Sequence, residues 1–407
     1  MFCKMPMKNL YIYIKRHARE LFWLLAPSLG ALVFNLLWRG VIVKLGPDAK
    51  LYLSIADNFL STGHFIQTAR AIENFVVPFG VPLILTLFRM ARFSTEAIVV
   101  VQHFMFGTTC MLLYKTEHTL FGKGGLAPFF FCVAMLLARI NPSNIFVEHY
   151  FLLLIAVLLY LSVQTEMPDK KRLTLMNAAG VYMVACRAVL APIYIAVLVY
   201  SLVSLLRRRI TSGRFAVFLL IPVILFGCNT LVNYRETGYP IVMDSYSGAD
   251  FYVANNPNAT TGYYDGSVFE TIGDEYYELK NDPSLNQVEK NARFKEMGKK
   301  WISENPGTFL SNTFKKLNKE FVQIWYGVLV VSSAGAVYMF AAFSKWRKWI
   351  AVTFLLALIV SFITAMGLVL IRYTIVVWPL ASVHLASLVY AGSEWIKKRF
   401  QKQKCRT

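Results

Sequence analysis

The chain has 407 residues, 56% of them hydrophobic and 15% aromatic, and carries a formal net charge of +19. Its mean hydropathy of +0.48 is far above that of a soluble globular domain of this length, so the composition excludes a soluble protein and indicates an integral membrane protein. The positive charge does not indicate a nucleic-acid partner, because the basic residues cluster in short loops and tails between apolar runs, as the positive-inside rule requires.

Apolar runs of nearly the length of a membrane span, about 20 residues, recur along the chain. The first run, 21–43, follows a basic N-terminal stretch and is too long, with too few small residues at its end, to be a cleaved signal peptide. We therefore expect a retained first span. Including it, the sequence predicts about ten transmembrane helices. The later runs are 96–114, 124–140, 150–163, 173–189, 192–206, 215–232, 322–343, 350–370 and 374–391.

The stretch 75–91 is also apolar, but Pro78, Pro82 and Arg89 interrupt it. Counting it as a span would move the basic cluster 207–209 and the basic C-terminal tail to the outer face, against the positive-inside rule. We therefore expect this stretch to lie along the outer membrane interface. Both termini of the protein are then expected to be cytoplasmic.

The expected fold is an all-α polytopic membrane protein with juxtamembrane helices in its first outer loop. Residues 1–233 form an N-terminal transmembrane module that includes the first outer loop, 44–95. Residues 234–321 form a small α or α+β extracytoplasmic segment. Residues 322–407 form the last transmembrane helices and a basic cytoplasmic tail.

The extracytoplasmic segment is the only polar part long enough to fold outside the membrane. Its first half, 239–265, is rich in Tyr, Asn, Gly and Asp and is expected to be loop with short extended pieces. Ser284 and Gln287 have capping-box spacing, which predicts the start of a helix. The Asn-Pro-Gly motif at 305–307 should end that helix, and a further helix is expected from Thr308.

Four charged residues on the outer face are the main candidates for a reactive site. Asp48 lies at the mouth of the first span, where a carboxylate stays hydrated, and Glu148 opens an apolar run, where an unpaired acid is unfavourable. Arg187 and Arg372 interrupt or adjoin apolar runs, and each would cost about 2.5–3.5 kcal/mol at the centre of a span. The two arginines should therefore lie near the outer ends of their spans and face a polar cavity. A guanidinium group there could bind a phosphate bidentately.

Each of these candidates also has a structural interpretation. Asp48 could stabilise a helix that begins near Ala49, since a carboxylate in the first turn gains about 0.3–1 kcal/mol from the helix dipole. Glu148 could be a solvated loop charge. Arg187 and Arg372 could reach lipid headgroups from the interface.

Several motifs on the outer face resemble those of one family. The stretch 46–56, Gly-Pro-Asp-Ala-Lys-Leu-Tyr-Leu-Ser-Ile-Ala, resembles the first outer loop of the GT-C glycosyltransferases, the superfamily of protein O-mannosyltransferases and of the bacterial enzymes that attach aminoarabinose to lipid A. This chain departs from the pattern at Ala49, where many relatives have a second acid. Further similar segments follow in family order: Pro78-Phe-Gly-Val-Pro82 with Gln102, Asn141-Pro142 with Glu148, the Gly- and Asn-rich stretch 248–263, and Arg372-Tyr373 leading to Pro379.

The resemblance implies inverting transfer of a sugar from a polyprenyl-phosphate carrier to a lipid-linked or cell-envelope glycan, such as O-antigen or lipid A, at the periplasmic face of the bacterial inner membrane. Asp48 would be the general base, and Glu148 would orient the acceptor or the sugar. Some relatives bind a divalent metal near the second outer loop, although this chain has no metal-ligand spacing there. The other residues implied are the phosphate-binding Arg372, Arg187, Lys50 and Arg70 and the substrate-binding Tyr52 and Tyr373.

Two other classes of protein remain open. A lipid-linked oligosaccharide flippase or other transporter would place its charged groups at mid-depth with access to both faces, and such proteins often contain inverted repeats. No repeat is evident in the sequence. An accessory or assembly protein would keep the fold without an open cavity around Asp48.

Overall fold

A computed structural model describes residues 7–40, 42–66, 76–138, 140, 142–259, 272–320, 333–340, 344–366 and 375–404. Every regular element within these ranges is a helix, so the all-α class is confirmed for the described chain. The helices before residue 240 are α1 (Met7–Arg39), α2 (Pro47–Thr62), α3 (Gly80–Met90), α4 (Thr95–Phe121), α5 (Leu126–Leu137), α6 (Val147–Val163), α7 (Asp169–Cys186), the 3-10 turn η2 (Ala188–Leu190), α8 (Ala191–Leu206) and α9 (Ser212–Thr237). Those after it are α10 (Ser247–Ala254), α12 (Asp274–Asn281), α13 (Gln287–Glu304), α14 (Pro306–Glu320), η4 (Ser344–Trp346), α16 (Arg347–Met366), η5 (Ile375–Val377) and α18 (Trp378–Lys404).

Apolar helices of membrane-spanning length support a multi-pass membrane protein. Among the described residues six segments are long and apolar enough to cross a bilayer: His17–Trp38, Thr95–Phe121, Ala188–Leu206, Ser212–Thr237, Arg347–Met366 and Ile375–Ile396. The helices α5 and α6 are apolar but shorter, and α7 begins with the charged sequence Asp-Lys-Lys-Arg. The expected span 322–343 falls mostly on residues that the structure does not describe. The described helices therefore do not establish the expected count of about ten.

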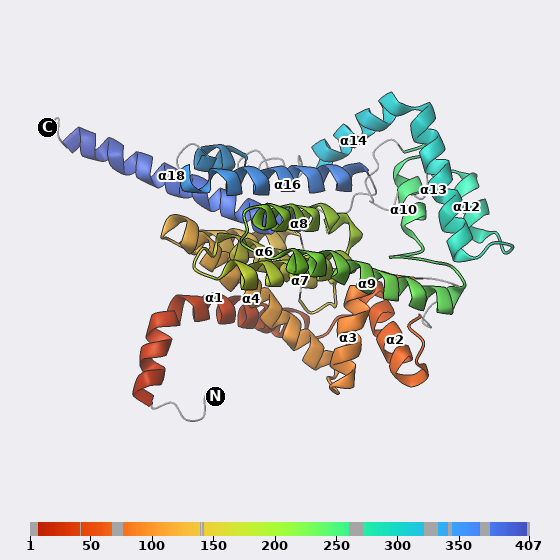
Figure 1. The fold of residues 1–407 in the computed structure, drawn as a ribbon, viewed down its shortest axis with the longest axis horizontal. Coiled ribbons are helices and arrows are strands. Elements are labelled where there is room, and N and C mark those ends of the chain that lie inside the picture. Colours follow the sequence, from red (N-terminus) through yellow and green to blue (C-terminus); the bar gives the residue numbers. More distant parts are fainter. Residues whose placement is uncertain are drawn as a thin grey trace.

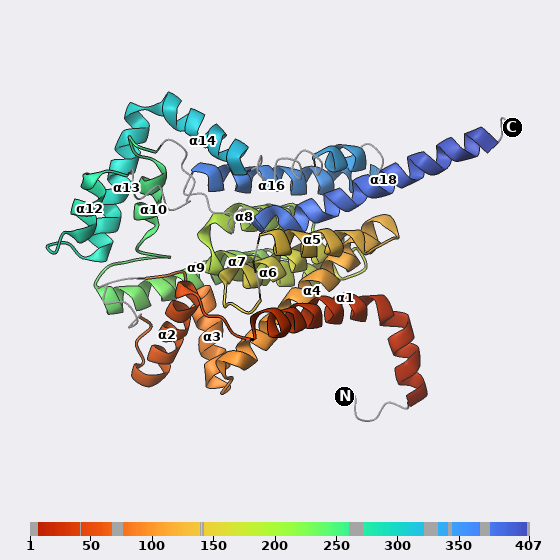
Figure 2. The ribbon, with the colours of Figure 1, turned by 180° about the vertical axis from the view of Figure 1, so that it is seen from behind.

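Close helix packing explains the positions of two glycines. The helix α1 runs beside α4, α4 packs on α6, and α5 lies against α18 (Figure 2). A Cβ atom on Gly107 of α4 would lie 2.0 Å from the carbonyl oxygen of Leu24 in α1. A Cβ atom on Gly180 of α7 would lie 2.6 Å from the ring of Tyr194 in α8. Only glycine allows these helices to approach so closely.

The helix bundle has two chemically different ends. The basic end carries the loops rich in Lys and Arg that were expected in the cytoplasm. There the carboxylate of Glu117 in α4 accepts hydrogen bonds from the N–H groups of Gly125 and Ala127 at the start of α5, at 2.7 and 3.1 Å, and from the hydroxyl of Tyr390 in α18 at 2.6 Å. The opposite end, which we call the loop end, carries α2, α3 and the helices α10 to α14 (Figure 1).

The short helix α3 belongs to the loop end. Its 11 residues extend about 16 Å, which is half the thickness of a bilayer's apolar core. One face of α3 is buried, including Val81 and Leu85, and packs against α2 and α7. This length agrees with leaving 75–91 out of the set of spans.

Three helices of the segment 234–321 enclose a small core of their own. The prediction of loop with extended pieces over 239–265 was wrong at α10, where the chain is helical from Ser247 to Ala254. The helix brings the ring of Tyr252 to 5.7 Å from that of Phe294 in α13, and this tertiary contact outweighs the turn-forming composition of the stretch. The core consists of Tyr252, Val253, Ala254, Ile272, Tyr276 and Phe294.

The start of α13 also differs from the prediction. Its N-cap is Asn286, whose side chain accepts hydrogen bonds from the N–H groups of Val288 and Glu289, and the carboxylate of Glu289 accepts one from the N–H of Asn286. This capping box lies two residues beyond the predicted one. Ser284 instead donates its N–H and its hydroxyl to Asp282, at 2.8 and 2.6 Å. An Asp side chain that forms such a turn takes Ser284 out of the capping role.

The predicted break at 305–307 is confirmed. Helix α13 ends at Glu304 and α14 begins at Pro306, two residues before the expected start at Thr308. A proline at the first helical position loses no hydrogen bond and already has a helical φ angle, which explains the earlier start.

Candidate functional site

Asp48 lies in the first turn of α2, directly after Pro47. The N-cap residue is Gly46, in an extended conformation with no side chain to cap the helix. The Asp48 carboxylate is therefore the group that can stabilise this helix end, by about 0.3–1 kcal/mol. Its side chain is half-buried. The structural role that the sequence suggested for Asp48 is thus present, and it is compatible with a catalytic role.

The short loop 142–146 lies against the chain that leads into α2. The N–H of Lys44 donates to the carbonyl oxygen of Ser143 at 3.0 Å. The N–H of Gly46 donates to the side-chain oxygen of Asn144 at 3.0 Å. A Cβ atom on Gly46 would lie 2.8 Å from the Asn144 amide nitrogen, so a larger residue would displace the Asn144 side chain from this contact.

Gln102 fastens the same loop to the membrane helices. It is fully buried in α4, and its side-chain nitrogen donates to the carbonyl oxygens of Pro142 and Asn144 at 3.1 and 3.0 Å. The loop runs directly into α6, whose first turn contains Glu148. The hydrogen bonds of Asn144 and Gln102 therefore hold the helix ends that carry Asp48 and Glu148 at the same end of the bundle.

Glu148 and Arg187 form an ion pair inside the protein. The distance from Arg187 Nη1 to Glu148 Oε1 is 3.3 Å, and the two side chains are 19% and 1% exposed. The pair joins the first turn of α6 to the C-terminal end of α7, where Arg187 is the C-cap residue in an extended conformation. A charge buried this deeply is tolerated only with a partner. Arg187 was predicted as a phosphate ligand from the sequence, and its pairing with Glu148 was not expected.

The start of α3 packs on the end of α7, next to Arg187. The hydroxyl of Tyr182 donates to the carbonyl oxygen of Gly80 at 2.6 Å. A Cβ atom on Gly80 would lie 2.7 Å from the backbone nitrogen of Cys186. The backbone that presents Arg187 is therefore held from three directions: by its own helix, by α3 and by the ion pair with Glu148.

Three polar atoms near this end of the bundle are buried without a hydrogen-bond partner among the described residues. They are Glu148 Oε2, Gln102 Oε1 and the hydroxyl of Tyr150. Buried polar atoms in folded proteins are nearly always satisfied by protein, water or a ligand. Two of the three are acceptors, so each calls for a hydrogen-bond donor from outside the described residues.

The remaining predicted residues divide into described and undescribed positions. Lys50 is exposed on α2, and Tyr52 is buried one turn after Asp48. Arg70, Arg372 and Tyr373 fall outside the described residues. The described chain resumes at Ile375, and η5 packs against α6, the helix that carries Glu148.

The segment 234–321 is attached to the rest of the loop end by several hydrogen bonds. The N–H of Val76 donates to Ser245 Oγ at 2.8 Å, and the N–H of Ser245 donates to the carbonyl oxygen of Val76 at 3.0 Å. The side-chain nitrogen of Asn255 donates to the carbonyl oxygen of Met366, at the end of α16, at 3.1 Å. These contacts place α10 over the end of the bundle that holds Asp48 and Glu148.

No group of three or more His, Cys, Asp and Glu side chains comes close enough to hold a metal ion within the described part of the chain. No family model matches the chain, and neither a characterised protein nor a solved structure matches it.

The sequence offered weaker signals for the supporting residues than for the charged ones. Gln102 could be singled out as a polar residue within an apolar helix. Asn144 and Ser245 could not, because polar residues are ordinary in loops. Their importance depends on contacts with Gly46 and Val76, which only the folded chain reveals.

Proposed function

We propose that the chain is a GT-C-type membrane glycosyltransferase that uses a polyprenyl-phosphate sugar as its donor. The observation that carries the proposal is the buried Glu148–Arg187 ion pair, which lies at the same end of the helix bundle as Asp48. Asp48, Glu148 and Arg187 lie at helix ends at one end of the bundle, which supports an enzyme that acts at one membrane face. A transporter would place such groups at mid-depth.

The chemistry is an inverting displacement at the anomeric carbon of the sugar. An acceptor hydroxyl attacks this carbon, the bond to the phosphate oxygen breaks, and the polyprenyl phosphate leaves with the electron pair. Asp48 takes the proton of the attacking hydroxyl, for which positioning matters as much as basicity. Glu148 Oε2 accepts a hydrogen bond from a hydroxyl group of the sugar or of the acceptor glycan.

The leaving phosphate needs cations to stabilise its developing charge. We assign this role to Arg187 and Arg372, with Lys50 and Arg70 as further cationic candidates and Tyr52 and Tyr373 as substrate contacts. A guanidinium carries five N–H donors in a fixed fork. The ion pair with Glu148 would orient the guanidinium of Arg187 toward the phosphate.

The proposed setting is the bacterial inner membrane, with about ten spans and both termini in the cytoplasm. The positive-inside rule supports this orientation. The short loops rich in Lys and Arg lie at one end of the bundle, and α2, α3 and α10 to α14 lie at the other (Figure 1). The acceptor would then be a lipid-linked or cell-envelope glycan, such as O-antigen or lipid A, on the periplasmic side.

The test is sugar transfer by the purified full-length protein. The protein is incubated with a panel of polyprenyl-phosphate sugars and acceptor glycolipids, and release of polyprenyl phosphate is measured. Asp48→Asn should reduce the rate by about 10²–10⁴-fold, the usual contribution of a general base. Asp57→Asn is the matched control, because Asp57 lies on the same helix, is 55% exposed and pairs with Arg89 of α3 rather than with a residue of the proposed site.

Full turnover by a folded Asp48→Asn protein would remove Asp48 as the base. Movement of a lipid-linked oligosaccharide across proteoliposome membranes, with no release of polyprenyl phosphate from any donor, would replace the enzyme with a transporter.

A further inference from the structure

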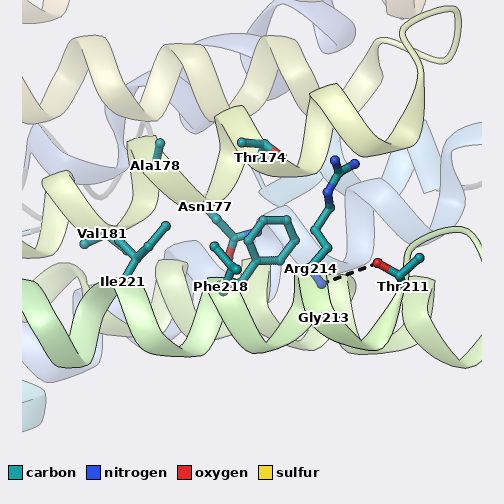
Figure 3. Close-up of a pocket in the computed structure, with 10 residues that line it drawn as sticks. Thr174, Asn177, Ala178, Val181, Thr211, Gly213, Arg214, Phe218 and Ile221 are labelled. Atoms are coloured by element: carbon teal, nitrogen blue, oxygen red, sulfur yellow. Dashed lines mark hydrogen bonds between the residues drawn. The ribbon is translucent and has the colours of Figure 1, made fainter.

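A groove of about 490 Å³ lies between α7 and α9, away from the loop end (Figure 3). Its volume is within the range of small-molecule sites, about 300–1,000 Å³. None of the residues proposed for sugar transfer lines it. The groove is therefore distinct from the site proposed for sugar transfer.

The groove is polar at one end and apolar along its length. Arg214 and Thr211 lie at one end, close to the start of α9, and Thr174 of α7 faces them (Figure 3). Val181 and Ile221 form the other end (Figure 3). A ligand that matches this arrangement has an anionic head and a hydrocarbon tail, because guanidinium groups bind phosphate and apolar side chains bind hydrocarbon.

Asn177 provides a second, independent sign of a ligand at the middle of the groove. It is 2% exposed, and its side-chain nitrogen donates to the carbonyl oxygen of Leu173 at 2.8 Å and to Ser201 Oγ at 3.0 Å. The Ser201 hydroxyl itself donates to the carbonyl oxygen of Val197 at 2.9 Å. Both partners of the amide nitrogen must therefore act as acceptors, which fixes the orientation of the amide.

The carbonyl oxygen of Asn177 is left without a hydrogen-bond partner among the described residues. Asn177 lines the groove between its charged and apolar ends, beside Phe218 (Figure 3). A buried acceptor at this position calls for a donor from whatever fills the groove. The occupant should therefore carry a hydroxyl or an ammonium group near its phosphate.

The groove opens toward the hydrocarbon that would surround the protein. Val217 and Ile221 of α9 are 48% and 43% exposed, and Leu175 of α7 is 42% exposed. The polar mouth of the groove lies at the basic end, next to the arginine cluster 207–209. Basic pockets between transmembrane helices on this side are typical of binding sites for anionic lipid headgroups.

We infer that the groove between α7 and α9 binds an anionic phospholipid with a hydroxyl-bearing headgroup, such as phosphatidylglycerol, from the leaflet at the basic end. The phosphate contacts Arg214, a headgroup hydroxyl donates to Asn177, and one acyl chain lies along Val181 and Ile221. The inference stands whether or not the loop end transfers a sugar.

The experiment measures lipid binding to the delipidated full-length protein in neutral detergent, by native mass spectrometry and by the shift in unfolding temperature. The probes are phosphatidylglycerol, phosphatidylcholine, diacylglycerol and inorganic phosphate. Phosphatidylglycerol should bind at least tenfold more tightly than diacylglycerol, which has no phosphate for Arg214, as expected when a charged hydrogen bond is gained. It should also bind more tightly than phosphatidylcholine, whose phosphate is neutralised by a quaternary ammonium group that cannot donate a hydrogen bond to Asn177. Inorganic phosphate at the same concentration should not displace it.

Two variants and one control locate the site. Arg214→Gln should weaken phosphatidylglycerol binding by about tenfold. Ala178→Trp should abolish it by filling the groove, and Ala178 is exposed, so the larger side chain does not disturb the core. Arg207→Gln removes an equal charge from the same end of the bundle but not from the groove, and should retain binding within about twofold.

Unchanged phosphatidylglycerol binding in either Arg214→Gln or Ala178→Trp would overturn the inference. Equal loss of binding in Arg207→Gln would also overturn it, by showing that general surface charge attracts the lipid. Equal binding of diacylglycerol would show that the groove recognises hydrocarbon alone, and displacement by inorganic phosphate would show a site for a free anion.

Discussion

The guanidinium of Arg187 lies 3.3 Å from the carboxylate of Glu148, Nη1 to Oε1, and joins the end of α7 to the start of α6. The two residues are far apart in the sequence, and each lies at the end of its helix. Their pairing fixes the relative position of two helix ends at the place where Asp48 is also held. The ion pair is therefore both a structural contact and the centre of the proposed site.

The first prediction concerns the stability that this pair provides. Glu148→Gln leaves the largely buried Arg187 without its counter-charge, which should lower the free energy of unfolding by about 3 kcal/mol. Glu394→Gln breaks the surface pair with Lys123, whose side chains are 48% and 49% exposed, and should cost about 0–1 kcal/mol. Unfolding by denaturant in mild detergent compares the two variants.

The double variant Glu148→Gln with Arg187→Gln supplies the control for this prediction. It removes both charges, so its free energy of unfolding should fall by less than the sum of the decreases in the two single variants. If Glu148→Gln costs no more than Glu394→Gln, the pair does not hold the two helix ends together.

The second prediction concerns the contact between α3 and α7. A Cβ atom on Gly80 would lie 2.7 Å from the backbone nitrogen of Cys186, so Gly80→Ala should force the helices apart and cost about 1–3 kcal/mol. Gly30→Ala in α1 is the control, because an added Cβ there meets nothing within 4 Å. It should be neutral or slightly stabilising. Thermal unfolding of the two variants checks the difference, and equal stability would contradict the close contact.

The sequence predicted most helices of the bundle because long apolar runs have few alternatives in a bilayer. The run 21–43 corresponds to α1, although the helix begins at Met7, since basic residues at the start of a span do not interrupt a helix. The helix α10 was missed because a composition rich in Gly, Asn and Tyr favours turns. Its core contacts come from α12 and α13, which no local pattern could reveal.

The candidate site was predictable only in part. Charge and spacing placed Asp48, Glu148 and Arg187 on one face, and the structure places the helix ends that carry them at one end of the bundle. The ion pair depends on how α6 packs on α7, which the sequence does not specify. The roles assigned to Arg372 and Arg70 stay predictions, since both positions fall among the residues that are not described.

The third prediction concerns pH and the small core formed by α10, α12 and α13. Burial raises the pKa of Tyr252 to about 12, with the neighbouring carboxylate of Glu275 adding to the effect. The folded pKa lies above the ordinary value of about 10, so the stability that Tyr252 contributes is complete below pH ~10 and is lost as the pH rises through ~12. Hydrogen exchange of α10 and α13 as a function of pH measures this loss.

Two variants test the assignment to Tyr252. Tyr252→Phe should make protection of α10 less dependent on alkaline pH, because no phenol has to be deprotonated there. Tyr277→Phe removes a phenol that is 38% exposed and should leave the pH dependence unchanged. Identical alkaline profiles for wild type and Tyr252→Phe would place the titrating group elsewhere.

The fourth prediction tests the packing of α4 on α5, which sequence patterns did not specify. The sulfur atoms of Cys110 and Cys132 lie 3.5 Å apart between these helices. A membrane-permeable oxidant should therefore take two electrons from the thiols and join them as a disulfide. Lys115 and Lys123 lie between the two cysteines in the sequence, so tryptic cleavage there leaves two fragments held together only by that bond. The fragments should migrate together until a reductant is added, and Cys132→Ser should abolish the linkage. Separation of the oxidised fragments without a reductant would mean that α4 and α5 do not pack with these two cysteines facing each other.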